Sequence, residues 1–280
     1  MKSIIGGIAL TALAAIPAIA ADIPPTPLYK TASTPVSTWA GAYVGIELGG
    51  KWADSTWTTT SILTPPAFPA SVDASSPAHF GMSDGRRIGG YAGYNWQSER
   101  WVYGVEFDGA YAAGTAPQTT GVPGCAILCV AGSPGPGMDS ARVRMNWDAS
   151  ARARLGYIVT PDLLIYETAG AAWQSMQTSA TCKNVDIDPL CVGVVGAPLN
   201  TQTHTKLLPG WTVGGGLELK IAANLLLRGE YRFAQFSGND SMTFPAPVFG
   251  VGSGPTTLNY RLSVDTHLAT VGLAYKFSGL

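Results

Sequence analysis

The residues Val143–Tyr157 alternate between apolar and polar side chains, and this pattern limits the folds open to the chain. The odd positions hold Val143, Met145, Trp147, Ala149, Ala151, Ala153, Leu155 and Tyr157, and the even positions hold Arg144, Asn146, Asp148, Ser150, Arg152, Arg154 and Gly156. Successive side chains of a strand point to opposite faces, whereas a helix repeats every 3.6 residues. The stretch therefore predicts a strand with one apolar face and one densely charged face.

Similar alternation recurs along the chain. It predicts eight strands, at about 39–57, 87–97, 100–113, 142–158, 162–178, 203–220, 224–238 and 258–277. Short connections at 97–100, 160–162 and 221–223 alternate with long ones at about 58–86, 114–141, 179–202 and 239–257. This sorting of loops is typical of outer-membrane barrels. We therefore expect an all-β, eight-stranded antiparallel up-and-down transmembrane barrel with four long extracellular loops and three short periplasmic turns.

The low charge of the chain supports a barrel in lipid. Only 12% of the residues are charged, against about 25% in typical globular domains. Lipid leaves no water for backbone groups, so strands that cross it must close into a ring. Lys and Arg number 17 and Asp and Glu 18. This balance, without a basic cluster, gives no reason to expect a nucleic-acid partner.

The first residues are typical of a secretory leader. Lys2 precedes an apolar run from Ile4 to Ile16, and the small-residue site Ala18-Ile19-Ala20 follows. We expect residues 1–20 to be a signal peptide cut before Ala21; a transmembrane anchor fits less well. The segment 21–38 is rich in proline and is expected to be a periplasmic linker, and 39–280 the barrel.

Charged residues on one face of the predicted strands are expected to point into the barrel and form a lumen network. Its expected members are Glu47, Arg87, Glu106, Asp108, Arg144, Asp148, Arg152, Arg154, Glu167, Glu218, Lys220, Arg228, Glu230 and Arg232. Buried charges are tolerable when paired, and an eight-stranded barrel has just enough interior for side chains. We expect this network to fill the barrel; a narrow, gated ion path is the alternative.

Aromatic residues near the strand ends suit interfacial girdles. They include Trp39, Tyr43, Trp52, Trp57, Trp96, Trp101, Tyr157, Trp173 and Tyr275. The last strand has an inconsistency, because its apolar residues are even from Leu258 to Val264 and odd from Ala269 to Phe277. A bulge near Asp265–Leu268 would explain the switch. Alternatively, the first half of the strand projects beyond the membrane.

Four cysteines, Cys125, Cys129, Cys182 and Cys191, fall in segments rich in Gly and Pro. In an exported protein an even number suggests disulfide bonds. Local pairs, Cys125–Cys129 and Cys182–Cys191, are the expected connectivity, and pairing between the two segments is the alternative. No histidine lies near them at the spacing of a zinc site.

Several short stretches resemble the outer-membrane immunogenic proteins of alphaproteobacteria, which are porin-family barrels with the architecture of the OmpA transmembrane domain. They are Trp39–Gly45 after the Pro-rich segment, Gly89–Trp96, and Val105–Asp108. The residues Val271, Gly272, Leu273, Tyr275 and Phe277 resemble the terminal signal read by the barrel-assembly machinery. Members usually end on that aromatic residue, whereas Ser278-Gly279-Leu280 follow here.

The resemblance implies an integral outer-membrane protein with a structural or surface-interaction role, a surface antigen in contact with outer-membrane lipids and lipopolysaccharide. A porin-like channel or a surface ligand-binding barrel is the alternative, and some relatives are reported to bind haem, for which this chain offers His79, His204 and His267. An enzyme needs a nucleophile beside a base; Ser263 and His267, about 13 Å apart along one strand, do not meet this need. We expect no catalytic, cofactor or metal site.

Overall fold

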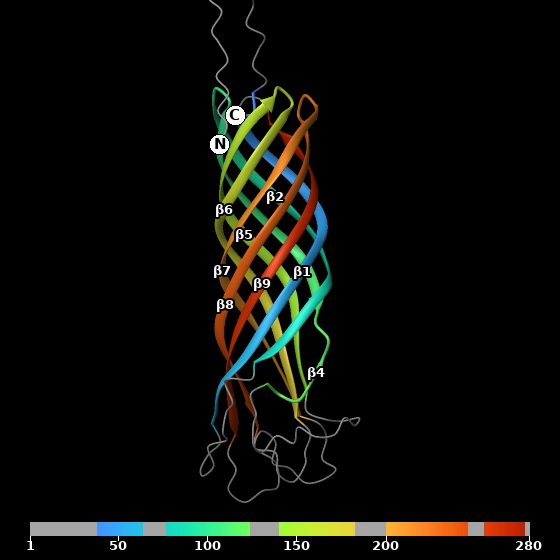
Figure 1. The fold of residues 1–280 in the computed structure, drawn as a ribbon, viewed down its shortest axis with the longest axis vertical. Helices are drawn as coiled ribbons and strands as arrows, with labels where there is room; N and C mark the ends of the chain where they lie inside the picture. Colours follow the sequence, from blue (N-terminus) through green and yellow to red (C-terminus); the bar gives the residue numbers. More distant parts are fainter. Residues whose placement is uncertain (1–37, 64–76, 124–139, 183–199, 246–254, 278–280) are drawn as a thin grey trace, which may run out of the picture. The chain divides into compact units, whose positions relative to one another are not determined.

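The computed structural model describes residues 38–63, 77–123, 140–182, 200–245 and 255–277, which belong to one compact unit. This unit is a single sheet of long, tilted strands (Figure 1). Its strands are β1 (Gly41–Leu63), β2 (Ala78–Ser98), β3 (Trp101–Thr115), β4 (Thr119–Thr120), β5 (Ser140–Thr160), β6 (Leu163–Cys182), β7 (Asn200–Ala222), β8 (Leu225–Phe244) and β9 (Thr256–Lys276). Among the described residues, no helix is long and apolar enough to cross a membrane.

Eight of these strands close into an antiparallel ring. Each pairs with its neighbour in sequence, β3 pairs with β5, and β1 closes the ring against β9; the short β4 pairs with β5 at its margin. Following paired residues once around the ring from Lys51 leads back to β1 at Gly41, a stagger of ten residues. Such a stagger tilts the strands and fixes the width of the interior. The predicted ring of eight antiparallel strands is confirmed.

The two ends of the barrel differ. Tight turns at 99–100, 161–162 and 223–224 lie at one end, the turn end, which is the upper end in Figure 1. The barrel also begins and finishes there, because the amide of Phe277 donates to the carbonyl of Ala42 at 2.9 Å. We call the opposite end the loop end. Most of the segments that join strands there, the expected signal peptide and most of the expected linker lie outside the described residues.

Several strands extend further toward the loop end than the sequence predicts. β1 continues to Leu63 rather than 57, β8 continues to Phe244 rather than 238, and β2 begins at Ala78 rather than 87. Parts of the expected long loops are therefore barrel wall. The sequence pattern missed these strand ends because their apolar residues face inward and their polar residues face outward, the reverse of the arrangement in the apolar zone.

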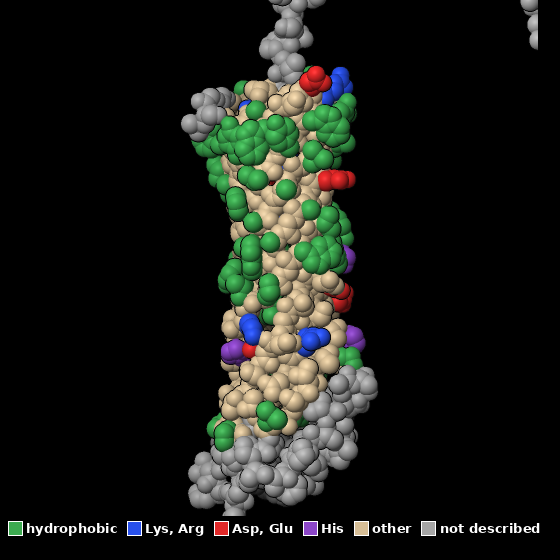
Figure 2. Space-filling view, turned by 90° about the vertical axis from the view of Figure 1, so that its left-hand side faces the viewer, with side chains coloured by type: hydrophobic (Ala, Val, Ile, Leu, Met, Phe, Trp, Pro, Cys, Tyr) green, Lys and Arg blue, Asp and Glu red, His purple; other side chains and the backbone are tan. Residues whose placement is uncertain are grey.

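The outer surface has two zones. On β1 the outward positions are apolar at Ile46, Leu48 and Trp52, and polar beyond, at Asp54 and Thr56. Figure 2 shows a similar division: toward the turn end hydrophobic side chains dominate, with a few charged ones at the rim and edge, and toward the loop end charged side chains and histidines replace most of the hydrophobic ones. The wall is therefore apolar outside over one stretch of its length and polar outside over the rest.

The apolar zone is as tall as a membrane is thick. Trp147 and Tyr157 both lie on the outer face of β5, ten residues apart. At about 3.3 Å per residue and a tilt of about 40°, they are separated by about 25 Å along the axis, the height of the apolar band of outer-membrane barrels. Exposed aromatic residues mark its two margins: Trp96, Trp101, Tyr103 and Tyr275 near the turn end, and Trp52, Tyr111, Trp147 and Trp211 on the other side.

Three of the expected girdle residues lie inside the barrel instead. Trp39, Tyr43 and Trp57 are buried. Their positions fall on the inward phase of the first strand or at its start, and each packs with other interior side chains. The sequence could not separate them from the outward aromatic residues, because both kinds lie close to strand ends.

The strand that contains Val143–Tyr157 changes phase at a bulge. Its pairing with β6 shifts register between Met145 and Asp148. Before the bulge the odd residues Val143 and Met145 are buried, whereas after it the even residues are buried and the odd residues from Trp147 face outward. The apolar residues of Val143–Tyr157 thus lie on the inner face before the bulge and on the outer face after it, because the extra residue reverses the alternation.

Of the two explanations for the switch in the last strand, the bulge near Asp265–Leu268 is wrong. β9 pairs with β8 without a register shift from Tyr275 to Thr256. Its even residues point inward throughout, so that Leu258, Tyr260 and Leu262 are buried near the loop end while Arg261 is exposed. The alternation is kept, and the polarity of the two faces is inverted, as suits a wall that extends beyond an apolar band.

Inward-facing glycines make room for tyrosines of the neighbouring strand. Tyr43 of β1 is paired with Gly93 of β2, and a Cβ at Gly93 would lie 2.4 Å from the Tyr43 hydroxyl oxygen. Tyr166 and Gly216 form a similar pair between β6 and β7, where the distance would be 2.6 Å. The small residues therefore let aromatic rings lie across the interior.

Gly93→Ala should destabilise the barrel by about 1–3 kcal/mol, because the added methyl group pushes Tyr43 out of place. The matched control is Gly229→Ala on the outer face, where a Cβ would meet no atom within 4 Å. Urea titration of the refolded proteins, followed by heat-modifiability on gels, measures both. Equal midpoints for the two variants would contradict this packing.

Candidate functional site: a closed lumen and a side-chain seam

Twelve buried charged side chains meet inside the barrel at the level of the apolar zone. Six are anionic and six cationic, so the set is neutral. They are Glu47, Glu106, Asp108, Asp148, Glu218 and Glu230, with Lys51, Arg87, Arg152, Arg154, Arg228 and Arg232. We call this set the charge network; its ion pairs link six of the eight strands of the ring.

Arg87 is the centre of the part nearer the loop end. Its guanidinium donates to Glu47 and Asp108, and its Nε lies 3.1 Å from Asp148 Oδ1. Lys51 Nζ donates to the other oxygen of Asp148 at 2.7 Å. Because each carboxylate faces at least one cation, the cost of removing these charges from water is offset by pairing.

Glu106 is the centre of the part nearer the turn end. Arg228 binds both of its oxygens, with Nη1 3.0 Å from Oε1, and Arg152 donates to it as well. Arg228 Nε also donates to Glu218 at 2.8 Å, and Arg152 Nη1 donates to Glu230 at 2.7 Å. Bidentate pairs of this kind are strong and directional.

Tyrosines complete the network on its turn-end side. The hydroxyl of Tyr43 donates to Glu106 at 2.7 Å, and that of Tyr166 donates to Glu230 at 2.7 Å. The guanidinium of Arg154 stacks over the ring of Tyr166 at 3.8 Å, and that of Arg228 over Tyr91 at 4.0 Å. These cation–π contacts of buried guanidinium groups add to the ion pairing.

Three of the residues expected in the lumen network lie elsewhere. Arg144 faces outward, because the bulge in β5 reverses the alternation before Trp147. Glu167 is exposed on the outer face of β6, because its neighbour Tyr166 occupies the inward phase. Lys220 lies near the turn end, where its Nζ is 4.2 Å from the ring of Trp39 and donates to the carbonyl of Thr38 at 3.1 Å.

The expected set omits Lys51 and the three tyrosines. Lys51 is four residues from Glu47 on the same strand, and this even spacing does predict that it lies on the same face. The tyrosines gave no comparable signal, since an aromatic ring suits a lipid-facing wall equally well. The hydroxyl groups of Tyr43 and Tyr166 donate to carboxylates of the network, whereas the ring of Tyr91 stacks against the guanidinium of Arg228.

Apolar clusters close the lumen on both sides of the charge network. The turn-end cluster includes Trp39, Val102, Ile158, Leu164 and Leu226. The loop-end cluster is larger; its largest side chains include Trp57, Phe80, Met145, Met176, Leu208, Phe236, Met242, Phe244 and Tyr260. A cavity between the network and the loop-end cluster has a volume of about 20 Å³, enough for about one water molecule.

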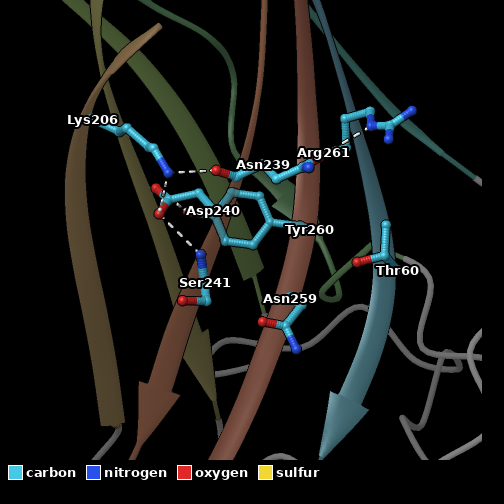
Figure 3. Close-up of a pocket in the computed structure, with 8 residues that line it drawn as sticks. All are labelled: Thr60, Lys206, Asn239, Asp240, Ser241, Asn259, Tyr260 and Arg261. Atoms are coloured by element: carbon cyan, nitrogen blue, oxygen red, sulfur yellow. Dashed lines mark hydrogen bonds and ion pairs between the residues drawn. The ribbon is translucent and has the colours of Figure 1, made fainter.

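The wall between β7 and β8 is held by side chains near the loop end. Their ladder of paired residues stops at Gly210 and Phe236, although both strands continue. Beyond this point Lys206 Nζ donates to the carbonyl of Asn239 at 2.5 Å and lies 3.6 Å from Asp240 Oδ1 (Figure 3). His204 Nδ1 lies 2.7 Å from Asp240 Oδ2. We call this part of the wall the seam.

Asp240 joins the seam to the interior. The hydroxyl of Tyr260 lies 3.1 Å from Asp240 Oδ2 and 2.7 Å from Thr178 Oγ1. Burial raises the pKa of Tyr260, so the hydroxyl stays protonated and can donate to the carboxylate. A groove of about 480 Å³ lies beside the seam and is lined by Thr60, Lys206, Asn239, Asp240, Ser241, Asn259, Tyr260 and Arg261.

The three histidines lie on three different strands. His79 Nδ1 is 3.2 Å from Thr56 Oγ1, His204 belongs to the seam, and His267 Nδ1 is 2.7 Å from the hydroxyl of Tyr231. Among the described residues, no group of His, Cys, Asp or Glu could hold a metal ion. Cys182 ends β6, while Cys125, Cys129 and Cys191 lie outside the described residues, as does any disulfide between them.

Glu106→Gln should lower the free energy of unfolding by about 3–5 kcal/mol, because it leaves Arg152 and Arg228 without full charge compensation. Glu167→Gln makes the same chemical change on the outer face and should be neutral within about 1 kcal/mol. Urea titration in phospholipid vesicles compares the two. A loss at Glu167 as large as that at Glu106 would show that the network does not stabilise the fold.

Asp240→Ala should loosen the seam. Losing the hydrogen bonds of this carboxylate lowers the free energy of local opening by about 1 kcal/mol. Amide exchange in 201–208 should therefore become about fivefold faster. Asp265→Ala is the control, because Asp265 accepts a hydrogen bond from Gln235 where β8 and β9 remain paired. Hydrogen–deuterium exchange with peptide resolution measures both. Unchanged exchange in 201–208 of the Asp240 variant would mean that other contacts hold the seam.

Known proteins resemble this chain along most of its length. The family model described as "Outer membrane protein beta-barrel domain" matches residues 7–277. The 25 kDa outer-membrane immunogenic protein of Brucella abortus is 28% identical over 254 residues, which is 91% of this chain and 86% of that protein. The 31 kDa outer-membrane immunogenic protein of Brucella melitensis is 27% identical and covers 99% of this chain and 100% of its own length.

A solved structure shares the fold. The outer membrane protease OmpT of Escherichia coli superimposes with a TM-score of 0.50, covering 85% of this chain and 97% of OmpT, at 9% identity. At this identity the likeness concerns the fold alone. Together with the ring of eight strands and the membrane-high apolar zone, the family match shows that the chain is an outer-membrane protein of a Gram-negative bacterium that belongs to the outer membrane protein β-barrel domain family.

Proposed function

We propose that this protein is a closed, non-catalytic barrel that acts as a structural and surface-interaction component of the outer membrane. The observation that supports this most directly is the filled lumen. A neutral set of twelve paired charges occupies its middle, and an apolar cluster lies on either side. An ion-selective pore needs a wetted path lined by charges or dipoles left available to the ion; these charges bind one another.

The orientation follows from the two ends. We propose that the three tight turns lie in the periplasm and that the loop end faces outward, as in other outer-membrane barrels. The polar outer zone of the wall and the four segments that join strands at the loop end then stand outside the cell. This arrangement fits a surface antigen, and the Brucella relatives are named outer-membrane immunogenic proteins.

We also propose that export and insertion use the two chain ends. Residues 1–20 serve as the signal peptide, and Val271, Leu273, Tyr275 and Phe277, which are exposed on the outer face of the last strand, are read by the barrel-assembly machinery. Amino-terminal sequencing of protein extracted from the outer membrane should then begin at Ala21. A sequence that begins at Met1 would mean that the leader is retained.

Planar-bilayer recordings test the closed lumen. The purified, refolded barrel should give no reproducible conductance steps in 1 M KCl, whereas a general porin recorded under the same conditions serves as the positive control. Heat-modifiability of the same sample shows that the barrel is folded. Reproducible unitary steps that disappear when the protein is boiled would favour the alternative of a narrow channel.

A further inference from the structure

Three exposed arginines lie on one face of the barrel just beyond the apolar zone. They are Arg86 on β2, and Arg142 and Arg144 on β5. Arg86 is paired with Ala113 of β3, and Arg144 is paired with Thr115 of the same strand. The arginines therefore flank a short piece of β3 that carries small side chains on its outer face.

The spacing lets the three side chains reach one anionic group. Neighbouring strands are about 4.8 Å apart, so β2 and β5 are about 10 Å apart across β3. Arg142 and Arg144 point outward from the same face of β5, about 7 Å apart. Because Ala113 and Thr115 are short, their side chains leave room for the guanidinium groups above them.

The structure describes no ion-pair partner for the three arginines; Asp84, two residues from Arg86 on β2, is not among the described side chains. None of the three arginines takes part in the ion pairs of the described residues; Arg142 Nη2 donates to the neutral side chain of Gln118 at 2.9 Å. Elsewhere in the polar outer zone, Lys206 lies beside Asp240, and Asp54 of β1 is paired with Asp265 of β9. An anion should therefore prefer the face that carries the arginines.

An aromatic surface lies next to the arginines on the membrane side. Tyr111 and Trp147 are exposed, are paired across β3 and β5, and mark the margin of the apolar zone. A ligand held here would place an acyl chain against these rings and a charged group against the guanidinium groups. Arginine suits phosphate because its planar fork forms two parallel hydrogen bonds.

We propose that Arg86, Arg142 and Arg144 form a binding site for the phosphate groups of lipopolysaccharide in the outer leaflet. This inference rests on the proposed orientation, in which the loop end faces outward. It deepens the proposed role, because a barrel that holds the glycolipid by its phosphates is anchored to the leaflet that carries its exposed surface. The site would be empty of phospholipid in an asymmetric outer membrane.

Native mass spectrometry of the refolded full-length protein tests the site. The probes are bisphosphorylated lipid A, dephosphorylated lipid A and phosphatidylglycerol. The test variant is R86Q/R142Q/R144Q. The control is R261Q, since Arg261 is an exposed arginine on β9 that likewise contacts a neutral side chain, that of Asn239. Heat-modifiability shows that each variant is folded.

The proposal expects the unaltered protein and R261Q to bind bisphosphorylated lipid A about tenfold more tightly than the triple variant does. Dephosphorylated lipid A and phosphatidylglycerol should bind the unaltered protein only weakly. Their affinity should be no higher than that of bisphosphorylated lipid A for the triple variant. Equal binding of bisphosphorylated lipid A to the triple variant and R261Q would overturn the site. Equal binding of phosphatidylglycerol would overturn its assignment to lipopolysaccharide. Conductance does not depend on this result, so failure here leaves the closed lumen standing.

Discussion

The pairing of Glu106 with Arg152 and Arg228 is the interaction on which the interior depends. A ring of eight strands with a stagger of ten residues encloses a space that only side chains can fill. A wall that faces lipid needs its apolar residues outside, so the polar residues of the same strands must point inward. Charges in that narrow space are tolerable only when each has a partner, and six anions facing six cations meet this condition.

The inversion of the wall beyond the apolar zone follows from the same reasoning. Where lipid ends, water contacts the outer face, and polar residues such as Asp54 and Thr56 move outside while Trp57 packs inside. Side chains still alternate between the two faces of each strand. Beyond the apolar zone, however, the outward residues are polar and the inward residues are apolar. Bulges such as that at β5 reverse the phase at this boundary. The loop-end cluster is therefore an ordinary apolar core that lies next to the charge network, on its loop-end side.

Much of the fold could be predicted from the sequence, since period-two alternation and the sorting of connections specify an eight-stranded ring. Positions such as Glu47, Arg87 and Glu106 follow from the phase of their strands. The phase itself could not always be derived. The single extra residue in β5 moves Arg144 outside, and Tyr166 moves Glu167 outside because its hydroxyl group finds Glu230. The seam could not be predicted from the sequence either, because the point where β7 and β8 stop pairing depends on both strands.

A double-mutant cycle on Glu106 and Arg228 tests the central claim most directly. It compares the free energies of unfolding of Glu106→Gln, Arg228→Met and the double variant in phospholipid vesicles. If the two side chains are bound to each other inside a dry lumen, the cycle should give a coupling free energy of at least about 1.5 kcal/mol. A coupling near zero would contradict the account, because it would mean that water, and not its partner, compensates each charge.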